Sequence, residues 1–121
     1  MASEIDFDEY DIVNTGRVVM GGALQLPVTQ VLTPAYVLTD LDCYVEISAA
    51  AQGNNGSIVL TIPLANDEAK GRLYILNNQN ITNSVVAAGP GYTSVLSPSS
   101  ITYLLCNGSS WVDITPSSGL L

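Results

Sequence analysis

From residue 34 onward, short apolar runs alternate with clusters of Gly, Pro, Asn, Asp and Ser. Runs of four to six residues that are rich in β-branched and aromatic side chains and bounded by turn residues are typical of β-strands. The pattern predicts an all-β fold, a small antiparallel β-sandwich or jelly-roll-like module with an extended N-terminal arm. The predicted strands are Tyr36–Thr39, Cys43–Ile47, Ser57–Ile62, Arg72–Leu76, Ser84–Ala88, Tyr92–Leu96, Ile101–Cys106 and Trp111–Ile114.

Two local signals refine this prediction. The dipeptide Asn107-Gly108 lies between the last two apolar runs and favours a tight hairpin, so the last two strands should be antiparallel neighbours. The stretch Leu64–Gly71 has the composition of a helix, but Pro63 and Gly71 confine it to about two turns. A fold built from βαβ units is therefore disfavoured.

The alternation within the strands selects a core. One face of each strand must turn inward, which predicts a core of Val37, Val45, Ile58, Leu60, Ile62, Leu73, Ile75, Leu104 and Trp111. Trp111 offers a large apolar ring opposite Leu104 or its neighbours, while its indole N–H needs an acceptor. We expect Trp111 to anchor the core, and the alternative is an exposed platform that stacks on a sugar.

The first 33 residues form a different kind of segment. Five of the eleven acids lie between Glu4 and Asp11, where they alternate with apolar residues at the period of a strand. Gly21-Gly22 supplies a flexible joint, and Pro27 and Pro34 favour an extended edge segment over a central strand. We therefore divide the chain into an N-terminal arm and extended linker, residues 1–33, and a β-sandwich module, residues 34–121.

The arm is the predicted partner-binding site. An alternating segment of this kind adds a strand to an exposed sheet edge of a neighbour, and its acids steer it toward a basic surface. The residues expected to contact the partner are Ile5, Phe7, Tyr10, Ile12 and Val13. The alternative is a disordered, solvated tail, because terminal acidic segments often stay unfolded.

The charge balance excludes several classes of partner. Three Lys and Arg residues stand against eleven Asp and Glu, which gives a net charge of -8, so we expect no binding to nucleic acid. The same balance argues against an anionic membrane surface, and no apolar run reaches the roughly 18 residues of a spanning helix. The acidic N-terminus does not resemble an export signal, so we expect synthesis in the cytoplasm and unpaired thiols at Cys43 and Cys106.

The residues that usually carry chemistry are scarce. The chain has no His, the commonest general base and metal ligand, and it has no phosphate-binding loop, nucleophile elbow or dinucleotide fingerprint. Three acid pairs fit solvation, a turn and the start of a short helix better than catalysis or a calcium loop: Asp6/Asp8, Asp40/Asp42 and Asp67/Glu68. The Asn-x-Ser/Thr sites lie at turn positions: Asn55, Asn80 and Asn107. We expect no enzyme, no cofactor and no metal site.

Three stretches of the sequence carry a resemblance to a known family. A strand ends in Ile62-Pro63, a strand that follows Gly71 ends at Asn77, and the last hairpin reads Asn107-Gly-Ser-Ser-Trp111. With these motifs, the chain from Tyr36 to Ile114 resembles a β module of tailed-phage virion structural proteins, found in capsid decoration (cement) proteins and in head or tail fibre proteins. It departs from the family at Ser97-Pro-Ser-Ser100, where a Pro-Gly turn is common.

The resemblance implies a capsid decoration protein that binds and stabilises the assembled shell as a homotrimer. The major capsid protein would be its partner, and the capsid surface of the virion its location. The alternative is a receptor- or carbohydrate-binding module of a head or tail fibre, with Tyr44, Tyr92 and Tyr103 as candidate contacts. The length of the chain and its arm favour decoration, while a small hydrolase has no histidine and no motif behind it.

Overall fold

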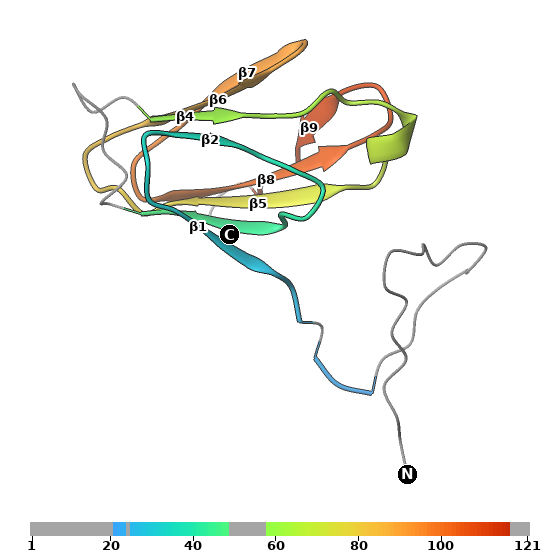
Figure 1. Ribbon diagram of the computed structural model, residues 1–121, viewed down its shortest axis with the longest axis horizontal. Coiled ribbons are helices and arrows are strands. Elements are labelled where there is room, and N and C mark those ends of the chain that lie inside the picture. Colours follow the sequence, from blue (N-terminus) through green and yellow to red (C-terminus); the bar gives the residue numbers. More distant parts are fainter. Residues whose placement is uncertain (1–20, 24, 49–57, 117–121) are drawn as a thin grey trace.

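The computed structural model describes residues 21–23, 25–48 and 58–116, which form a sandwich of two β-sheets (Figure 1). The five-stranded sheet has the order β1-β3-β5-β8-β9, and its strands are β1 (Val28–Val31), β3 (Tyr44–Ile47), β5 (Leu73–Asn78), β8 (Ser100–Cys106) and β9 (Trp111–Asp113). The four-stranded sheet has the order β2-β4-β6-β7, and its strands are β2 (Ala35–Val37), β4 (Ile58–Thr61), β6 (Val85–Gly89) and β7 (Tyr92–Leu96). The prediction of a small all-β module is confirmed.

The eight predicted strands correspond to β2 through β9, and β1 was missed. Because β1 pairs with β3, with Val28 opposite Tyr44, the five-stranded sheet begins inside the segment predicted as linker, before residue 34. Pro27 precedes β1, and β1 lies at the edge of its sheet. The prediction of an extended edge segment is therefore right, but this segment belongs to the sandwich.

The pairing of the strands corrects the expectation of an antiparallel sandwich, because both sheets are mixed. From β1 to β6 the chain alternates between the sheets, so strands two apart in sequence lie side by side in parallel: β1–β3, β3–β5, β2–β4 and β4–β6. Between two neighbouring strands of one sheet, the chain passes through one strand of the opposite sheet. That strand runs in the reverse direction, so the next strand in the first sheet runs parallel to the previous one. The pairs β5–β8, β6–β7 and β8–β9 are antiparallel, as predicted for the last hairpin.

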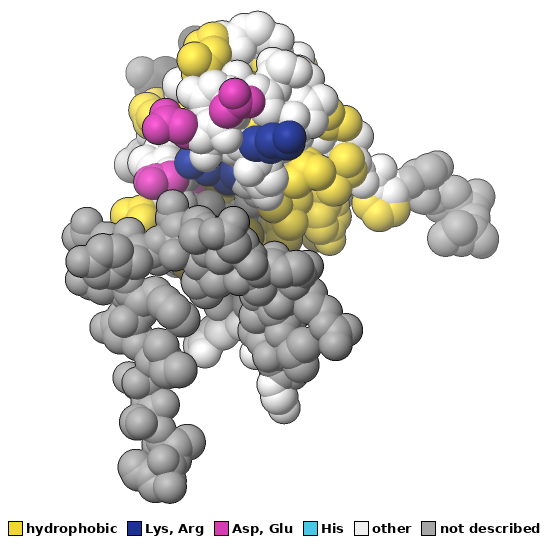
Figure 2. All heavy atoms as spheres, turned by 90° about the vertical axis from the view of Figure 1, so that its right-hand side faces the viewer, with side chains coloured by type: hydrophobic (Ala, Val, Ile, Leu, Met, Phe, Trp, Pro, Cys, Tyr) yellow, Lys and Arg dark blue, Asp and Glu magenta, His cyan; other side chains and the backbone are white. Residues whose placement is uncertain are grey.

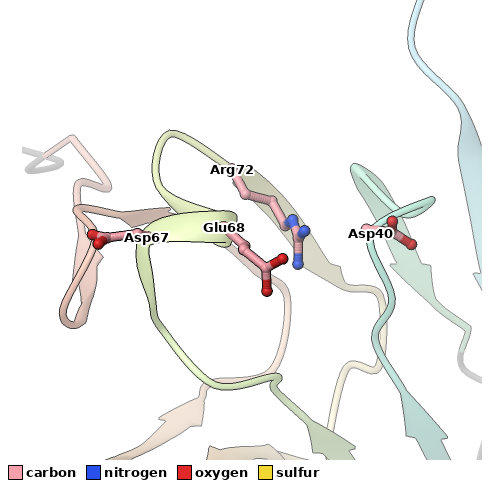
Figure 3. A pocket seen from close by; sticks show the side chains of 4 residues that line it. All are labelled: Asp40, Asp67, Glu68 and Arg72. Atoms are coloured by element: carbon pink, nitrogen blue, oxygen red, sulfur yellow. The ribbon is translucent and has the colours of Figure 1, made fainter. Parts of the chain in front are cut away.

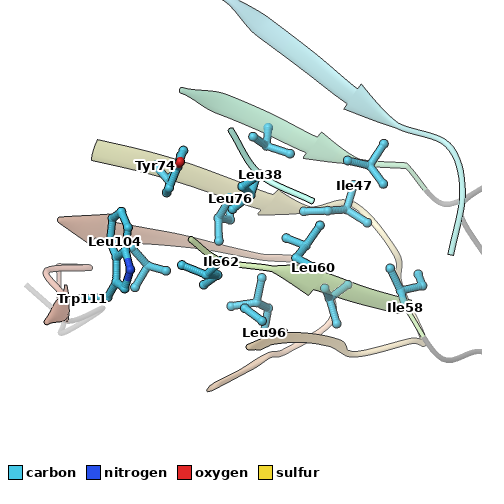
Figure 4. Packing of buried hydrophobic residues seen from close by; sticks show 14 of the residues in the cluster. Leu38, Ile47, Ile58, Leu60, Ile62, Tyr74, Leu76, Leu96, Leu104 and Trp111 are labelled. Carbon is cyan, nitrogen blue, oxygen red and sulfur yellow. The ribbon is translucent and has the colours of Figure 1, made fainter. Parts of the chain in front are cut away.

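The core lies between the two sheets (Figure 4). Six predicted core residues are buried there: Val45, Ile58, Leu60, Ile62, Leu104 and Trp111. The other three were wrongly assigned, because Val37 is exposed and Leu73 and Ile75 are half-buried on the outer side of β5. Tyr74 and Leu76 fill the core instead. Both alternating sets of β5 are apolar, so periodicity does not distinguish the inner set from the outer one.

Trp111 joins the two layers of the sandwich. Its indole N–H donates to the Pro63 carbonyl oxygen, which follows β4, at 2.8 Å, and its ring stacks on Tyr74 of β5 with centroids 5.2 Å apart. The residue is 5% exposed. Its predicted role as a core anchor is confirmed, and burial removes the alternative of a sugar-stacking platform.

The end of the sandwich near Trp111 carries two short connections. The predicted helical stretch contains a 3-10 helix, η2 (Asp67–Ala69), whose N-cap Asn66 accepts the Ala69 N–H through its side chain at 3.0 Å. In the β8–β9 hairpin, the Asn107 side chain accepts the backbone N–H groups of Ser109 and Ser110. Gly108 adopts φ 102°, a conformation that favours glycine. The sequence signals for both connections are confirmed.

Candidate assembly surfaces

The outward residues of the four-stranded sheet form an apolar surface. The strand register arranges them in two rows that cross all four strands. We call this surface the valine face, and it consists of Ala35, Val59, Val86 and Val95 in one row and Val37, Thr61, Ala88 and Thr93 in the other. None of the residues in these four strands is charged. Because sheets that face water usually carry polar residues on that side, the valine face has the composition of a contact surface.

The outward residues of the five-stranded sheet form a second surface, which is broader and chemically mixed. Its central row runs across β1, β3, β5 and β8. The row continues to Ile114, the residue after β9, because the Ile114 backbone N–H donates to the Tyr103 backbone oxygen. We call this surface the tyrosine face, and it consists of the central row Val28, Tyr44, Ile75, Tyr103 and Ile114, the row Leu73, Leu105 and Val112, and the row Gln30, Glu46, Asn77 and Ile101.

A hydrogen-bonded group lies within the tyrosine face. The Glu46 carboxylate accepts the Tyr44 hydroxyl at 2.9 Å and the Gln30 amide at 3.2 Å, and the Asn77 amide donates to the Tyr44 hydroxyl at 3.0 Å. These bonds hold the polar side chains in place beside the apolar rows. The face therefore offers a partner both apolar area and oriented hydrogen-bonding groups.

Charged side chains gather at the end of the sandwich that carries η2 (Figure 2). A pocket of about 600 Å³ at this end is lined by Asp40, Asp67, Glu68 and Arg72 (Figure 3). The predicted pair Asp67/Glu68 lies on η2, which has both acids in its first turn. Within the described ranges, no group of three Asp, Glu, Cys or His residues is arranged to hold a metal ion. The charged residues that line the pocket therefore lie at one end of the sandwich. The four strands of the valine face contain no charged residue.

Asp42 is separated from its predicted partner Asp40 and is buried, at 7% exposure. Its carboxylate accepts four groups: the Thr29 hydroxyl at 2.6 Å, the Tyr36 hydroxyl at 3.1 Å, and the N–H and hydroxyl of Thr39. Thr29 lies in β1 and Tyr36 in β2. One carboxylate therefore ties the edge strand of each sheet to the loop between β2 and β3.

The pKa of Asp42 lies below its ordinary value of 3.8. Burial acts to raise this pKa, but the hydrogen bonds from Thr29, Thr39 and Tyr36 together outweigh it. The pKa of the Tyr36 hydroxyl is raised, by burial first and then by its hydrogen bond to Asp42. The charged form of Asp42 is thus the one that the fold stabilises.

We predict that Asp42→Asn lowers the free energy of unfolding by about 2 kcal/mol at pH 7, because the amide accepts fewer of these hydrogen bonds. The depressed pKa means that the carboxylate's contribution is present above the unfolded pKa and is lost as pH falls through the folded pKa. The difference between wild type and variant should therefore shrink below about pH 4. Urea titrations at pH 7 and pH 3 measure it, and an equal difference at both pH values would contradict the assignment.

Two buried asparagines stabilise the opposite end of the sandwich. The Asn78 amide donates to the backbone oxygens of Asn83, Leu96 and Ser97 at 3.0 to 3.2 Å, and its side-chain oxygen accepts both the backbone N–H and the side-chain amide of Asn80. Asn80 is 2% exposed, so its glycosylation motif is not accessible in the folded chain. Sequence reasoning identified Asn80 as a turn residue but missed Asn78, because nothing in its local pattern distinguishes it from Asn77.

The remaining sequence-predicted site residues divide into three groups. The predicted partner-binding residues of the arm, Ile5, Phe7, Tyr10, Ile12 and Val13, lie outside the described residues. Tyr44 and Tyr103 lie in one row of the tyrosine face with Ile75 between them, whereas Tyr92 packs against the core. Cys43 and Cys106 are separate thiols.

Sequence reasoning also missed the valine face, although a signal for it exists. In β4 and β6, valines at outward positions alternate with apolar core residues, so both sides of each strand are apolar. Strands that are buried on both sides have this pattern.

Comparisons with protein-family models, curated proteins and solved structures give no match to this chain. In the part of the chain that the structure describes, no helix has the length and apolarity needed to cross a membrane.

Proposed function

We propose that this protein decorates and stabilises the assembled capsid shell of a tailed phage, and that it does so as a trimer. The observation that carries the proposal is the pair of outer faces, one apolar and one with apolar rows beside hydrogen-bonding groups, on a sandwich whose internal core is already filled. A sandwich that faced water on both sides would need polar residues at these positions. Two contact surfaces on opposite sides suit a protein that binds its own copies and also a second, larger assembly.

The shell contact is assigned to the tyrosine face and the arm. Residues 21–23 and 25–27 lead away from the sandwich before β1, which is the edge strand of the sheet that carries this face (Figure 1). An arm that begins there is well positioned to reach the same neighbour as the face. Interfaces between different proteins are enriched in tyrosine and retain hydrogen-bonding groups, as the tyrosine face does through Tyr44, Tyr103 and Glu46.

A fibre module that binds a receptor or a carbohydrate is the second candidate. Tyr44 and Tyr103 lie in one row of the tyrosine face, with the Asn77 amide and the Glu46 carboxylate beside Tyr44. Aromatic rings with oriented polar groups also suit a sugar. The two functions differ in copy number, because a decoration protein covers the shell in many copies and a fibre protein occurs in a few.

We predict that deleting residues Ala2 to Val13 abolishes most shell binding while the sandwich still folds and oligomerises. Strand addition by the arm supplies backbone hydrogen bonds and inserts apolar side chains, and its acids steer association. Co-sedimentation of the purified protein with assembled shells that lack it measures binding as a function of salt. Binding by the full chain should weaken with salt, whereas the residual binding of the truncated chain should not.

Circular dichroism and the solution mass of the truncated chain provide the control for its folding and assembly. Full occupancy of the shells by a truncated chain that folds normally would contradict the role of the arm. Failure of the full chain to bind shells at all would contradict the proposed function.

A further inference from the structure

The valine face is uncharged and exposed over its whole width. Val37 in β2 and Val95 in β7, at its two edges, are 61% and 60% exposed, and Val59 and Val86, near its centre, are 40% and 37% exposed. The register places Val59 directly between Ala35 and Val86 and places Val86 beside Val95. The row is therefore continuous across the sheet. Covering such an apolar surface with a partner removes it from water and lowers the free energy of the complex.

The charge distribution selects a second copy of this chain as that partner. With a net charge of -8, two copies repel each other wherever their acids meet, so they associate best through a surface that carries no charge. The described acids lie elsewhere: Asp40, Asp67 and Glu68 line the pocket at one end, Asp42 is buried, Glu46 is on the tyrosine face and Asp113 is in β9. Contacts between identical copies are also more apolar than contacts between different proteins.

The size of the valine face favours three copies over two. Four strands about 4.8 Å apart and three to five residues long give a face of roughly 15 Å by 10 to 17 Å. Its area is well below the approximately 800 Å² that each partner buries in a standard interface. Three copies around a common axis bury the same face and also bring the edge strand β2 of one copy toward the edge strand β7 of the next. Such a repeated contact between two different edges closes into a ring when the rotation between neighbouring copies is one third of a turn.

We propose that the valine face is the self-association surface, directed toward the three-fold axis of a homotrimer. The number of copies, three, rests on the proposed function. The choice of the valine face as the contact surface adds to that function. It also assigns the two sides of the sandwich to different partners: the valine face to copies of this chain, and the tyrosine face to the shell.

Val59→Asp tests the inference, with Ile101→Asp as the matched control. Both substitutions add one acid at a half-exposed apolar position, and Ile101, on the tyrosine face, is 44% exposed. Sedimentation velocity at micromolar concentrations should give the mass of three 12.7 kDa chains for wild type and for Ile101→Asp. Because three copies would place three like charges near one axis, Val59→Asp should weaken self-association about 100-fold and run as a monomer.

Val95→Asp provides a second variant, because its position at the edge strand β7 makes it tolerant of an acid, and it should also dissociate the trimer. Far-UV circular dichroism confirms that each variant is folded.

The inference is overturned if wild type is monomeric up to millimolar concentration, if folded Val59→Asp and Val95→Asp keep the wild-type mass, or if Ile101→Asp alone dissociates. A wild-type dimer would overturn the three-fold arrangement. A further outcome separates the two proposals. If wild type is a trimer that Val59→Asp dissociates, but wild type does not bind shells, this inference is upheld and the proposed function is contradicted.

Discussion

Replacing Asn78 by Asp should lower the free energy of unfolding by about 4 kcal/mol or more at pH 7. The two side chains have nearly the same shape, but the amide nitrogen donates to three backbone oxygens, of Asn83, Leu96 and Ser97. A carboxylate oxygen in that position repels all three and removes the hydrogen bonds that Asn78 donates, so that Ser97 keeps only the Ser100 hydroxyl as a side-chain donor. The position is fully buried, so water cannot compensate.

The Asn78→Asp variant should also show a distinctive dependence on pH. Burial and the facing carbonyl oxygens raise the pKa of the new carboxyl group above its unfolded value. The folded variant therefore binds more protons than the unfolded one, and its stability falls as pH rises above about 4. Relative to wild type, the variant should be closest in stability at pH 4 and furthest at pH 7.

Urea unfolding at pH 4, 5.5 and 7 measures both effects. Gln79→Glu is the matched control, because it makes the same amide-to-carboxylate change at the neighbouring, exposed position. It should change stability by less than about 0.5 kcal/mol. A loss below about 1 kcal/mol in Asn78→Asp, or a loss that does not vary with pH, would mean that the Asn78 amide does not hold these three carbonyl groups.

Trp111→Ala should lower the free energy of unfolding by about 3 to 5 kcal/mol. The variant loses the stacking on Tyr74, leaves a cavity beneath the β8–β9 hairpin and deprives the Pro63 carbonyl of its donor. Trp111→Phe keeps an aromatic ring and loses the indole N–H, so we expect a smaller loss of about 1 to 2 kcal/mol. Val112→Ala, on the tyrosine face, is the control for a change in the same strand, and its loss should stay below about 1 kcal/mol. Equal losses for Trp111→Ala and Val112→Ala would contradict the role of Trp111 as the core anchor.

Local sequence patterns predicted the strands well because turn-forming residues lie between almost all of the apolar runs. Pro, Gly and Asn residues separate the apolar runs, and the Asn107-Gly108 signal identified the last hairpin. Pairing was harder to predict, because a turn does not reveal whether the chain stays in one sheet or crosses to the other. The parallel pairs among β1 to β6 arise from such crossings.

The errors in the predicted core have a physical meaning. Leu73 and Ile75 have the same apolar character as Tyr74 and Leu76, and Val37 is as apolar as many buried residues, so alternation does not separate inside from outside. Strands of this kind are typical of sheets that are covered on both sides. Under the proposed assembly, the outward set is covered by a neighbouring molecule, and the ambiguity in the sequence reflects that second contact.

The buried polar residues were the least predictable part. Asp42 and Asn78 each bind groups contributed by distant segments, such as Thr29 for Asp42 and Leu96 for Asn78. Their burial follows from the arrangement of the strands rather than from neighbouring residues in the sequence. The charge and composition of the chain gave no indication of the valine face either, because its residues are ordinary strand residues.

For the proposed function, electron-microscopic reconstruction of intact phage particles assembled with this protein tests the central claim most directly. We expect density for the sandwich in many copies across the shell, grouped in threes, with the valine faces toward each three-fold axis and the tyrosine faces on the outer side of each trimer, in contact with the capsid protein. Density confined to a few copies at the tail or at a fibre, or a shell without the sandwich, would contradict the account.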